Sequence, residues 1–388
     1  MMLGTVIGPR VQPLTPLGRW EVLGRPLRAL RPGPALAGLL LLLLALVWSG
    51  VAMQRFEEVK QARAAEVMKK RKMGRKGDIA LYQRINDRLA RGQDYYTVAL
   101  DEQRNNHYPV KPFVTVRMPT LAWSSLLLGP TAWKWLGMGL LAAVALAWAT
   151  HLRQLASAPE RLLVLGVTVA AGWQALMPQI GLKHDVVAGL LLSLGFALYR
   201  PQRWWPAWFA VLLAVLVREL AVPFVLVWAA VALLGRRWTE LRAVLLLLAL
   251  CIAAIALHAW NVHAAQLPGD PASPGWSERL GLPLVWGSFA DVTLLRYLPA
   301  WSAGPLALLA LVGWAGIGGR TGLFALAWFG GMSVAVALFA RANTFYWVLV
   351  MLPGYFVGLA LAPRALADWI QAARGRIRRP RHGTLLGA

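Results

Sequence analysis

The residues best suited to chemistry lie in one long polar stretch, residues 77–120, of a chain that is otherwise mostly apolar. Carboxylates, aromatic rings and cations alternate along it. The carboxylates are Asp78, Asp94, Asp101 and Glu102, the tyrosines are Tyr82, Tyr95, Tyr96 and Tyr108, and the cations include Arg104, Lys111 and Arg117. A carboxylate serves as a general base, and arginines bind phosphate oxygens. This combination is typical of sugar-phosphate chemistry, and we expect the rest of the chain to hold the stretch against a bilayer.

Asp78 is the first candidate for the base. It follows Gly77 and precedes Tyr82, Ile85 and Leu89 at helical spacing, with a glycine at position 92 as a stop signal. Two interpretations stay open, because Asp78 can cap this helix or act as a general base at the outer membrane surface. The two roles are compatible if the free carboxylate oxygen faces a cleft.

Ionisable residues also interrupt the apolar segments. Arg218 and Glu219 lie in the middle of residues 206–234, where a charge is costly and marks a functional-site hypothesis. Arg218 is predicted to bind a lipid-linked phosphate in a bidentate fork, and the alternative is a self-satisfied pair at an outer helix end. His184 and Asp185 end a short outer loop, so Asp185 is either a helix N-cap beside a surface histidine, or both residues line the cleft.

The last predicted outer turn contains Arg341, which we expect to be a second phosphate ligand. Tyr346 and its aromatic neighbours fit a membrane-interface belt or a substrate contact. The complete predicted substrate-binding set is Tyr82, Tyr95, Tyr96, Glu102, Arg104, Tyr108, Arg117, His184, Asp185, Glu219 and Tyr346. The sequence contains no HExxH, Walker or Cys/His motif. No cofactor is predicted, and the scattered carboxylates leave the need for a divalent metal open.

The composition indicates a polytopic, all-α membrane protein. Of 388 residues, 58% are hydrophobic, and several apolar runs reach the length of a membrane span. The formal charge of +23 would suggest nucleic acid as the partner of a soluble protein. Here the cations fit cytoplasmic helix ends and anionic lipid headgroups better, so we expect membrane lipids and no nucleic acid. The single cysteine, Cys251, allows no disulfide within the chain.

The distribution of arginines predicts about ten spans with both termini in the cytoplasm. Residues 1–33 are a basic cytoplasmic segment, 34–366 the transmembrane domain, 54–118 the first extracytoplasmic loop and 367–388 a basic cytoplasmic tail. The predicted spans are 34–53, 132–150, 162–177, 186–198, two short spans within 206–234 that meet near residues 218–222, 243–260, 302–317, one ending near 339, and 348–361. The charged stretch 56–72 lies on the headgroups or continues the first span. The outer loop 261–299 is expected to hold a short surface helix.

Several segments resemble one known family. GDIALYQRI, DYYTVALDEQR and YPVKPFVTVRMPTLAW resemble the first outer loop of bacterial GT-C superfamily membrane glycosyltransferases, in the branch described as mannosyltransferase-like. HDVVAGLLLSL, LAVLVRELAVPFVL and RANTFYWVLVMLPGYFVGLALAPRAL resemble later segments of the same proteins. The resemblance extends from Asp78 to Leu366. It implies a GT-C-like fold in the bacterial inner membrane, with an active site on the extracytoplasmic side.

The resemblance also implies a polyprenyl-phosphate-linked sugar as donor and an acidic residue of the first outer loop as the base. That residue corresponds to Asp78, and Arg218 would face the donor phosphate. A basic segment separates the first span from Asp78, unlike many such enzymes, so Asp94 and Glu102 remain reserve candidates. The acceptor is a glycan, a lipid or a protein. The alternatives to a glycosyltransferase are a transporter or flippase of a lipid-linked sugar, and a non-catalytic subunit of an envelope assembly.

Overall fold

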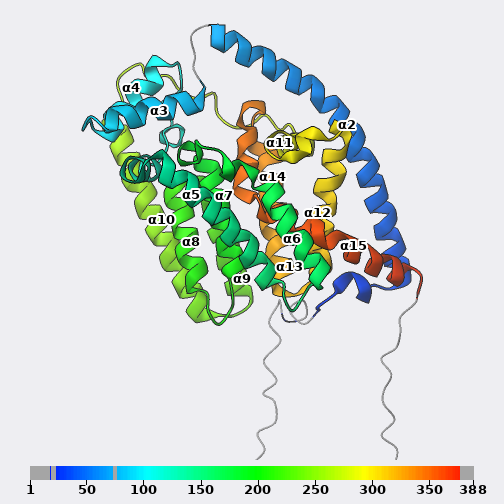
Figure 1. The fold of residues 1–388 in the computed structure, drawn as a ribbon. Coiled ribbons are helices and arrows are strands. Elements are labelled where there is room, and N and C mark those ends of the chain that lie inside the picture. The colour runs from blue at the N-terminus through cyan, green and yellow to red at the C-terminus, as the bar shows by residue number, and fades with distance from the viewer. Residues whose placement is uncertain (1–17, 19–22, 73–76, 376–388) are drawn as a thin grey trace, which may run out of the picture.

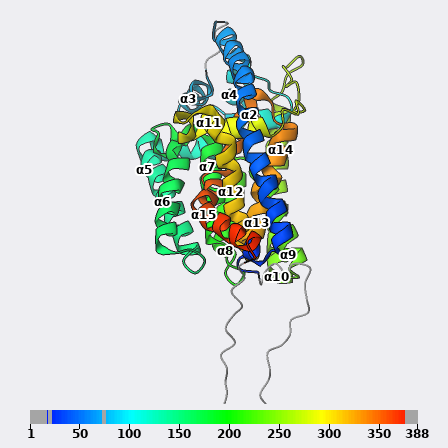
Figure 2. The same cartoon turned by 90° about the vertical axis from the view of Figure 1, so that its right-hand side faces the viewer.

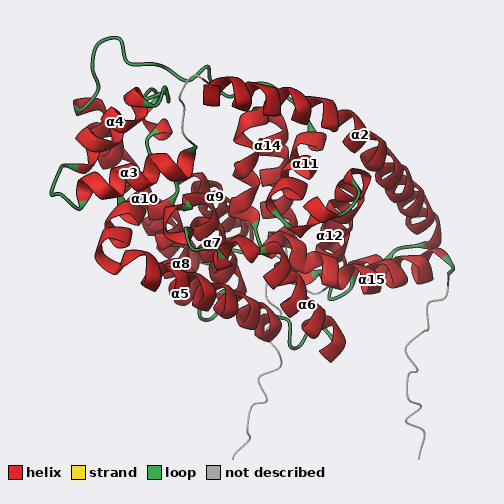
Figure 3. Cartoon of the chain, turned by 45° about the horizontal axis from the view of Figure 1, so that its top comes forward, coloured by secondary structure: helices red, strands yellow, loops and turns green. Residues whose placement is uncertain are grey.

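The computed structural model describes residues 18, 23–72 and 77–375, and this part of the chain consists of helices joined by loops (Figures 1 and 3). No β-strand occurs in it, and one isolated bridge joins Lys111 to Ala272. The helices are α2 (Pro32–Lys72), α3 (Asp78–Leu89), α4 (Tyr95–Asn105), α5 (Thr120–His151), α6 (Ala158–Ala171), α7 (His184–Leu198), α8 (Trp205–Val217), α9 (Val222–Leu234), α10 (Trp238–Ala264), α11 (Leu282–Val292), α12 (Ala303–Ile317), α13 (Gly319–Ala325), α14 (Gly331–Phe339) and α15 (Gly354–Ala373). The all-α prediction is confirmed.

Five helical segments are long and apolar enough to cross a membrane. They are Pro32–Glu58 of α2, Phe113–His151 with α5, α10, Ala300–Ile317 with α12, and Gly319–Phe339 with α13 and α14. A sixth is counted if the 3-10 helix η9 (Ala342–Met351) and α15, which meet at 69°, form one bent span. The other predicted spans correspond to α6, α7, α8 and α9, which have 13 to 15 residues each. Helices of that length measure about 20 Å, short of a core of about 30 Å, so the count of ten stays a prediction.

The bundle has two chemically different ends. At one end, uppermost in Figure 1 and called here the α3–α4 end, α5 and α7 begin and α8 and α10 finish. The turns between α5 and α6, between α7 and α8, and between α9 and α10 all lie at the opposite end. His151 marks this opposite end, because its ring bonds the Ala197 carbonyl and the Thr321 hydroxyl. The arginine-rich short turns therefore share one end, as the sequence predicts.

Residues 206–234 form two helices, as predicted, rather than one. α8 finishes at Val217, and α9 begins after the 3-10 turn η5 (Glu219–Ala221). Arg218 lies at the break, in an extended conformation that ends the helix. The break lies at the α3–α4 end, because Trp208 near the start of α8 bonds the Ala243 carbonyl of α10 at the opposite end.

Three details differ from the sequence predictions or extend them. α2 is one continuous helix of 41 residues, so residues 56–72 continue the first span (Figure 2). The helix predicted in the 261–299 loop exists as α11, but the prediction that it lies on the surface is wrong. Leu284, Trp286 and Phe289 are all buried there, because α11 packs against α2, α12 and α14. α15 continues to Ala373, beyond the predicted domain boundary at residue 366; residues 376–388 of the predicted tail, and most of residues 1–22, lie outside the described residues.

The closest helix packing in the bundle joins α12 to α15. A Cβ atom added to Gly313 would lie 1.8 Å from the Gly358 carbonyl oxygen, and one added to Gly358 would lie 2.1 Å from the Ala310 oxygen. Small residues allow two backbones to approach this closely, which is the usual basis of helix association in a lipid environment. This contact fixes α15 against the bundle.

We expect Gly313→Ala to destabilise the protein by about 3 kcal/mol or more, because a methyl group cannot fit against the Gly358 backbone. The measurement is thermal unfolding of the detergent-solubilised chain. Gly166→Ala is the matched control, since a Cβ atom at this helical position meets no atom within 4 Å. Equal stability of both variants would contradict the close approach.

Candidate functional site

Helices α3 and α4 form a small cap over the α3–α4 end of the bundle. Leu81, Ile85 and Leu89 repeat every four residues on one face of α3 and are buried against α4 and the segment that follows it. Tyr95 of α4 donates a hydrogen bond to the Arg117 carbonyl over 2.7 Å. The cap is thereby attached to the chain just before α5, and it holds the first turn of α3 above the bundle.

A buried group of charged residues lies beneath this cap. Arg218 Nε donates to Asp185 Oδ1 over 2.7 Å, and Arg117 Nη2 lies 3.7 Å from Asp185 Oδ2. Arg218 also pairs with Glu219, and the Arg117 guanidinium lies 5.6 Å from the centre of the Tyr346 ring. Asp185, Arg117 and Arg218 are all at least nine-tenths buried. We call Arg117, Asp185, Arg218 and Glu219 the charge cluster.

The charge cluster settles two alternatives that the sequence leaves open. The prediction that Asp185 is an N-cap is wrong, because Lys183 occupies the cap position and the Asp185 carboxylate pairs with arginines. A surface position for His184 is also wrong, since its side chain is buried. The Arg218–Glu219 pair exists, but it extends to Asp185 and is not self-contained.

Asp78 lies at the start of α3, on the solvent-exposed side of the cap. Gly77 is the N-cap residue of α3, and no side chain caps the helix, so the interpretation of Asp78 as a cap is wrong. The Tyr108 hydroxyl donates to Asp78 Oδ1 over 2.5 Å. This bond fixes the orientation of the carboxylate and leaves its second oxygen to other partners.

Tyr82 lies between Asp78 and the charge cluster. Burial raises the pKa of Tyr82 to about 12; the Arg117 guanidinium opposes this rise, and the Asp78 carboxylate adds to it. Tyr346 and Asp185 act on the same hydroxyl. Tyr82 lies one helical turn after Asp78 on α3, and its ring packs against that of His184, the sequence neighbour of Asp185.

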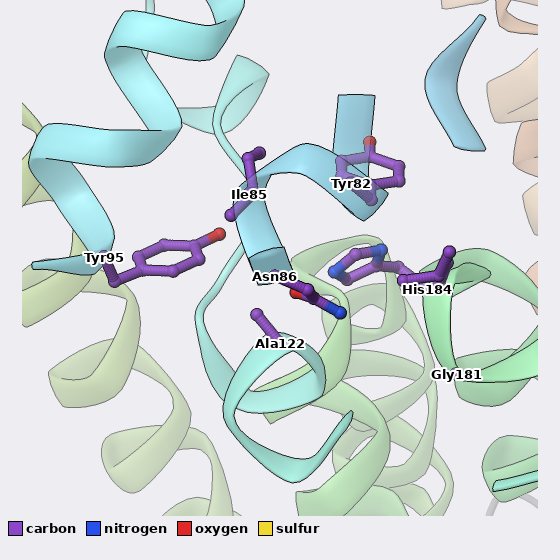
Figure 4. A pocket seen from close by; sticks show the side chains of 8 residues that line it. Tyr82, Ile85, Asn86, Tyr95, Ala122, Gly181 and His184 are labelled. Atoms are coloured by element: carbon purple, nitrogen blue, oxygen red, sulfur yellow. The ribbon is translucent and has the colours of Figure 1, made fainter. Parts of the chain in front are cut away.

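A small hollow lies next to Tyr82 (Figure 4). It is lined by Tyr82, Ile85, Asn86, Tyr95, Ala122, Gly181, Leu182 and His184 and measures about 10 Å³, enough for one water molecule. The rings of Tyr82 and His184 lie 4.8 Å apart. Neither His184 ring nitrogen makes a hydrogen bond within the described residues. Sequence reasoning missed Asn86, although its position one helical turn after Tyr82 places both on the same face of α3.

Other predicted residues have structural partners outside this group. Glu102 accepts bonds from Arg84 and Arg88 of α3; burial would raise its pKa, but these hydrogen bonds outweigh burial and lower it. Arg104 holds Asp270 in a bidentate pair that anchors the 265–272 loop. Tyr96 and Asp94 also have structural partners. The Tyr96 hydroxyl lies 3.3 Å from His258 Nδ1, and the Asp94 side chain caps α4 by accepting a hydrogen bond from the Thr97 amide.

Arg341 is the N-cap residue of η9, and it contacts the loop that precedes α11. Its Nη2 donates to Ser273 over 3.3 Å, and its guanidinium lies 5.9 Å from the centre of a Trp276 ring. Among the described residues, Arg341 makes no hydrogen bond or ion pair with Asp185 or Arg218. The structure thus brings Tyr346 against Arg117 of the charge cluster and Tyr82 against His184, the sequence neighbour of Asp185. Asp78 lies one helical turn before Tyr82, whereas Arg341 lies against a different loop.

Two further observations bear on ligands. Among residues 18, 23–72 and 77–375, no three His, Cys, Asp or Glu side chains are arranged to hold a metal ion. A larger hollow of about 320 Å³ lies between the start of the Phe113–His151 segment and the end of α10, and its lining includes Lys111, Phe113 and His263. It contains none of the charge-cluster residues.

Comparison of the chain with protein-family models, curated proteins and solved structures finds no match.

The Arg104–Asp270 pair gives a testable pH dependence. The Arg104 guanidinium holds the pKa of Asp270 below its usual value, so the pair stabilises the fold above about pH 4 and loses this contribution as the pH falls further. We expect Asp270→Asn to lower the unfolding temperature at pH 6 and to leave it nearly unchanged at pH 3. Thermal unfolding of both proteins across this range is the measurement. A difference that stays constant with pH would rule out the ion pair as its cause.

Proposed function

We propose that the chain is a membrane glycosyltransferase that moves a sugar from a polyprenyl-phosphate-linked donor to an acceptor hydroxyl. The observation that carries this proposal is the position of an exposed carboxylate, Asp78, one helical turn before Tyr82 on the cap, above buried guanidinium groups at the same end of an apolar helical bundle. The three chain segments that supply these groups are α3, the residues just before α5, and the break between α8 and α9. The resemblance of the 77–120 stretch to GT-C enzymes supports the same activity.

In this mechanism Asp78 is the general base. The acceptor oxygen attacks the anomeric carbon while its proton passes to Asp78 Oδ2, and the bond between that carbon and the phosphate oxygen breaks. The electron pair of the broken bond stays on the leaving phosphate. A single displacement inverts the anomeric centre. The Tyr108 hydroxyl, bonded to Asp78 Oδ1, keeps the carboxylate in position.

Arg218 and Arg117 are suited to the leaving phosphate. Asp185 fixes both guanidinium groups, and Arg117 Nε has no hydrogen-bond partner among the described residues. Fixed donors aimed at a group that gains charge stabilise a transition state without reorganisation. Arg117 fits the role of the second phosphate ligand better than Arg341, because it shares Asp185 with Arg218.

The arrangement of the arginine-rich turns supports an extracytoplasmic site. Those turns lie at the end opposite to the charge cluster. Cationic turns favour the cytoplasmic side of a membrane, so the site would face away from the cytoplasm. We propose the bacterial inner membrane as its location, with a glycan, lipid or protein as acceptor.

Transport of a lipid-linked sugar is less well supported. A transporter needs a polar path through its spans, with ionisable groups near the midplane. In the fully described helices α5, α7, α8, α9 and α10, no buried charged side chain occupies the central turns. The buried hydroxyl of Ser193 in α7 accepts from Trp148 and contributes to packing.

We expect Asp78→Asn to lower sugar transfer by about 10²- to 10⁴-fold, the usual contribution of a general base. The measurement is transfer of radiolabelled sugar from a polyprenyl-phosphate donor in membranes that contain the variant. Asp87→Asn is the matched control, because Asp87 is an exposed carboxylate on the same helix. Full turnover by Asp78→Asn would exclude Asp78 as the base.

We expect Arg117→Lys to lower transfer by about 10²-fold, because lysine keeps the charge but loses the planar fork. Arg341→Lys is expected to have a smaller effect, since Arg341 contacts the 273–278 loop and not the charge cluster. The two variants are compared in the same radiolabel assay. If Arg341→Lys is the more damaging change, the phosphate lies nearer to η9 than we propose.

A further inference from the structure

The hollow between Tyr82, Asn86 and His184 contains the largest unmet demand for hydrogen bonds near the site. His184 is only 5% exposed, yet neither of its ring nitrogens makes a hydrogen bond of normal length and angle among the described residues, although the Leu182 backbone lies close enough to act on the ring. A buried polar atom without a partner costs roughly 1–3 kcal/mol, so such atoms in native proteins usually meet water or a ligand. The hollow that His184 lines has room for one small group.

We propose that this hollow is a subsite for one hydroxyl group of a bound sugar, and that His184 and Asn86 select for that hydroxyl. The inference rests on the proposed glycosyl transfer and adds to it a residue pair that determines specificity. A water molecule fills the hollow in the absence of sugar, and the hydroxyl takes its place.

The lining chemistry favours a hydroxyl over a phosphate or a carboxylate. A hydroxyl both donates and accepts, which matches one imidazole and one amide, each with a donor and an acceptor. The remaining lining is aromatic or apolar and includes Ile85, Ala122 and Leu182. A phosphate is larger than one water molecule and would lie against apolar surface there, whereas the guanidinium groups of the charge cluster offer it charged donors.

The position of the hollow also orients the sugar. His184 and Asp185 are consecutive residues at the start of α7, and Asp185 holds Arg117 and Arg218. A sugar phosphate would place its phosphate at the charge cluster and one ring hydroxyl at His184. Tyr82, whose ring lies 4.8 Å from that of His184, would then contact the sugar between these two points.

The first experiment measures binding without any need for transfer. Thermal unfolding of the full detergent-solubilised chain is recorded with methyl mannoside, glucoside and galactoside, and with the single-deoxy analogues of each. We expect one parent glycoside to raise the unfolding temperature of the wild type, and removal of one particular hydroxyl to abolish most of this rise. His184→Leu should remove the distinction between that pair of ligands, and His184→Gln should restore part of it. His263→Leu, at an exposed histidine near the end of α10, is the matched control.

The second experiment applies the same comparison to transfer. We expect the wild type to prefer the hydroxylated donor over its deoxy analogue by about 10- to 10³-fold in kcat/KM, because the deoxy sugar leaves buried polar atoms unpaired. In His184→Leu this ratio should fall to near one. If His184→Leu does not fold, Asn86→Leu on the cap helix provides the same comparison.

The outcomes of the two experiments separate the subsite from the proposed glycosyl transfer. If no glycoside stabilises the wild type, if all single-deoxy analogues act like their parents, or if His184→Leu still distinguishes them, the subsite is wrong. If glycosides are distinguished but no sugar is transferred, the subsite stands and the proposed glycosyl transfer fails. If sugar is transferred but no deoxy analogue is distinguished from its parent, the proposed glycosyl transfer stands and the subsite fails.

Discussion

The site depends on one carboxylate held between two guanidinium groups. Removing a charge from water is expensive, so Asp185, Arg117 and Arg218 can remain buried only while each compensates the others. They come from the start of α7, the segment before α5 and the break between α8 and α9. The ion pairs therefore fix three chain segments relative to one another.

The cap supplies Asp78, a carboxylate that solvent can reach. α3 and α4 pack on each other through leucine, isoleucine and valine side chains, and ion pairs of Glu102 tie them together. The cap meets the bundle at Arg117, whose carbonyl accepts from Tyr95 while its guanidinium reaches Asp185. One residue thus contacts both parts. Any shift of the cap would change the position of Asp78 and that of Arg117 together.

Much of this arrangement could be predicted from local sequence, and the exceptions share a cause. The amphipathic α3, the break at Arg218 and the common end of the arginine-rich turns follow from periodicity and charge. Capping, one of two interpretations that the sequence leaves open for Asp78 and Asp185, is wrong for both, and both carboxylates have partners far away in sequence, Tyr108 and Arg218. The burial of α11 could not be predicted either, since its apolar face becomes recognisable only once α2, α12 and α14 surround it. The local sequence pattern identifies a helix or a charged residue, whereas the groups that the helix or the residue contacts depend on the tertiary fold.

Depth divides the proposed site into two chemical environments. Asp78 is exposed, so an acceptor arriving from water could reach it, while Arg218 is 3% exposed at the end of an apolar helix, where a lipid phosphate could approach. A proton acceptor works best where the acceptor hydroxyl enters, and fixed cations act most strongly where water is scarce. Tyr82 lies where the two environments meet, because its hydroxyl is influenced by both Asp78 and Arg117. In the proposed reaction the anomeric carbon would lie close to this tyrosine, with the base on one side of the sugar and the leaving phosphate on the other.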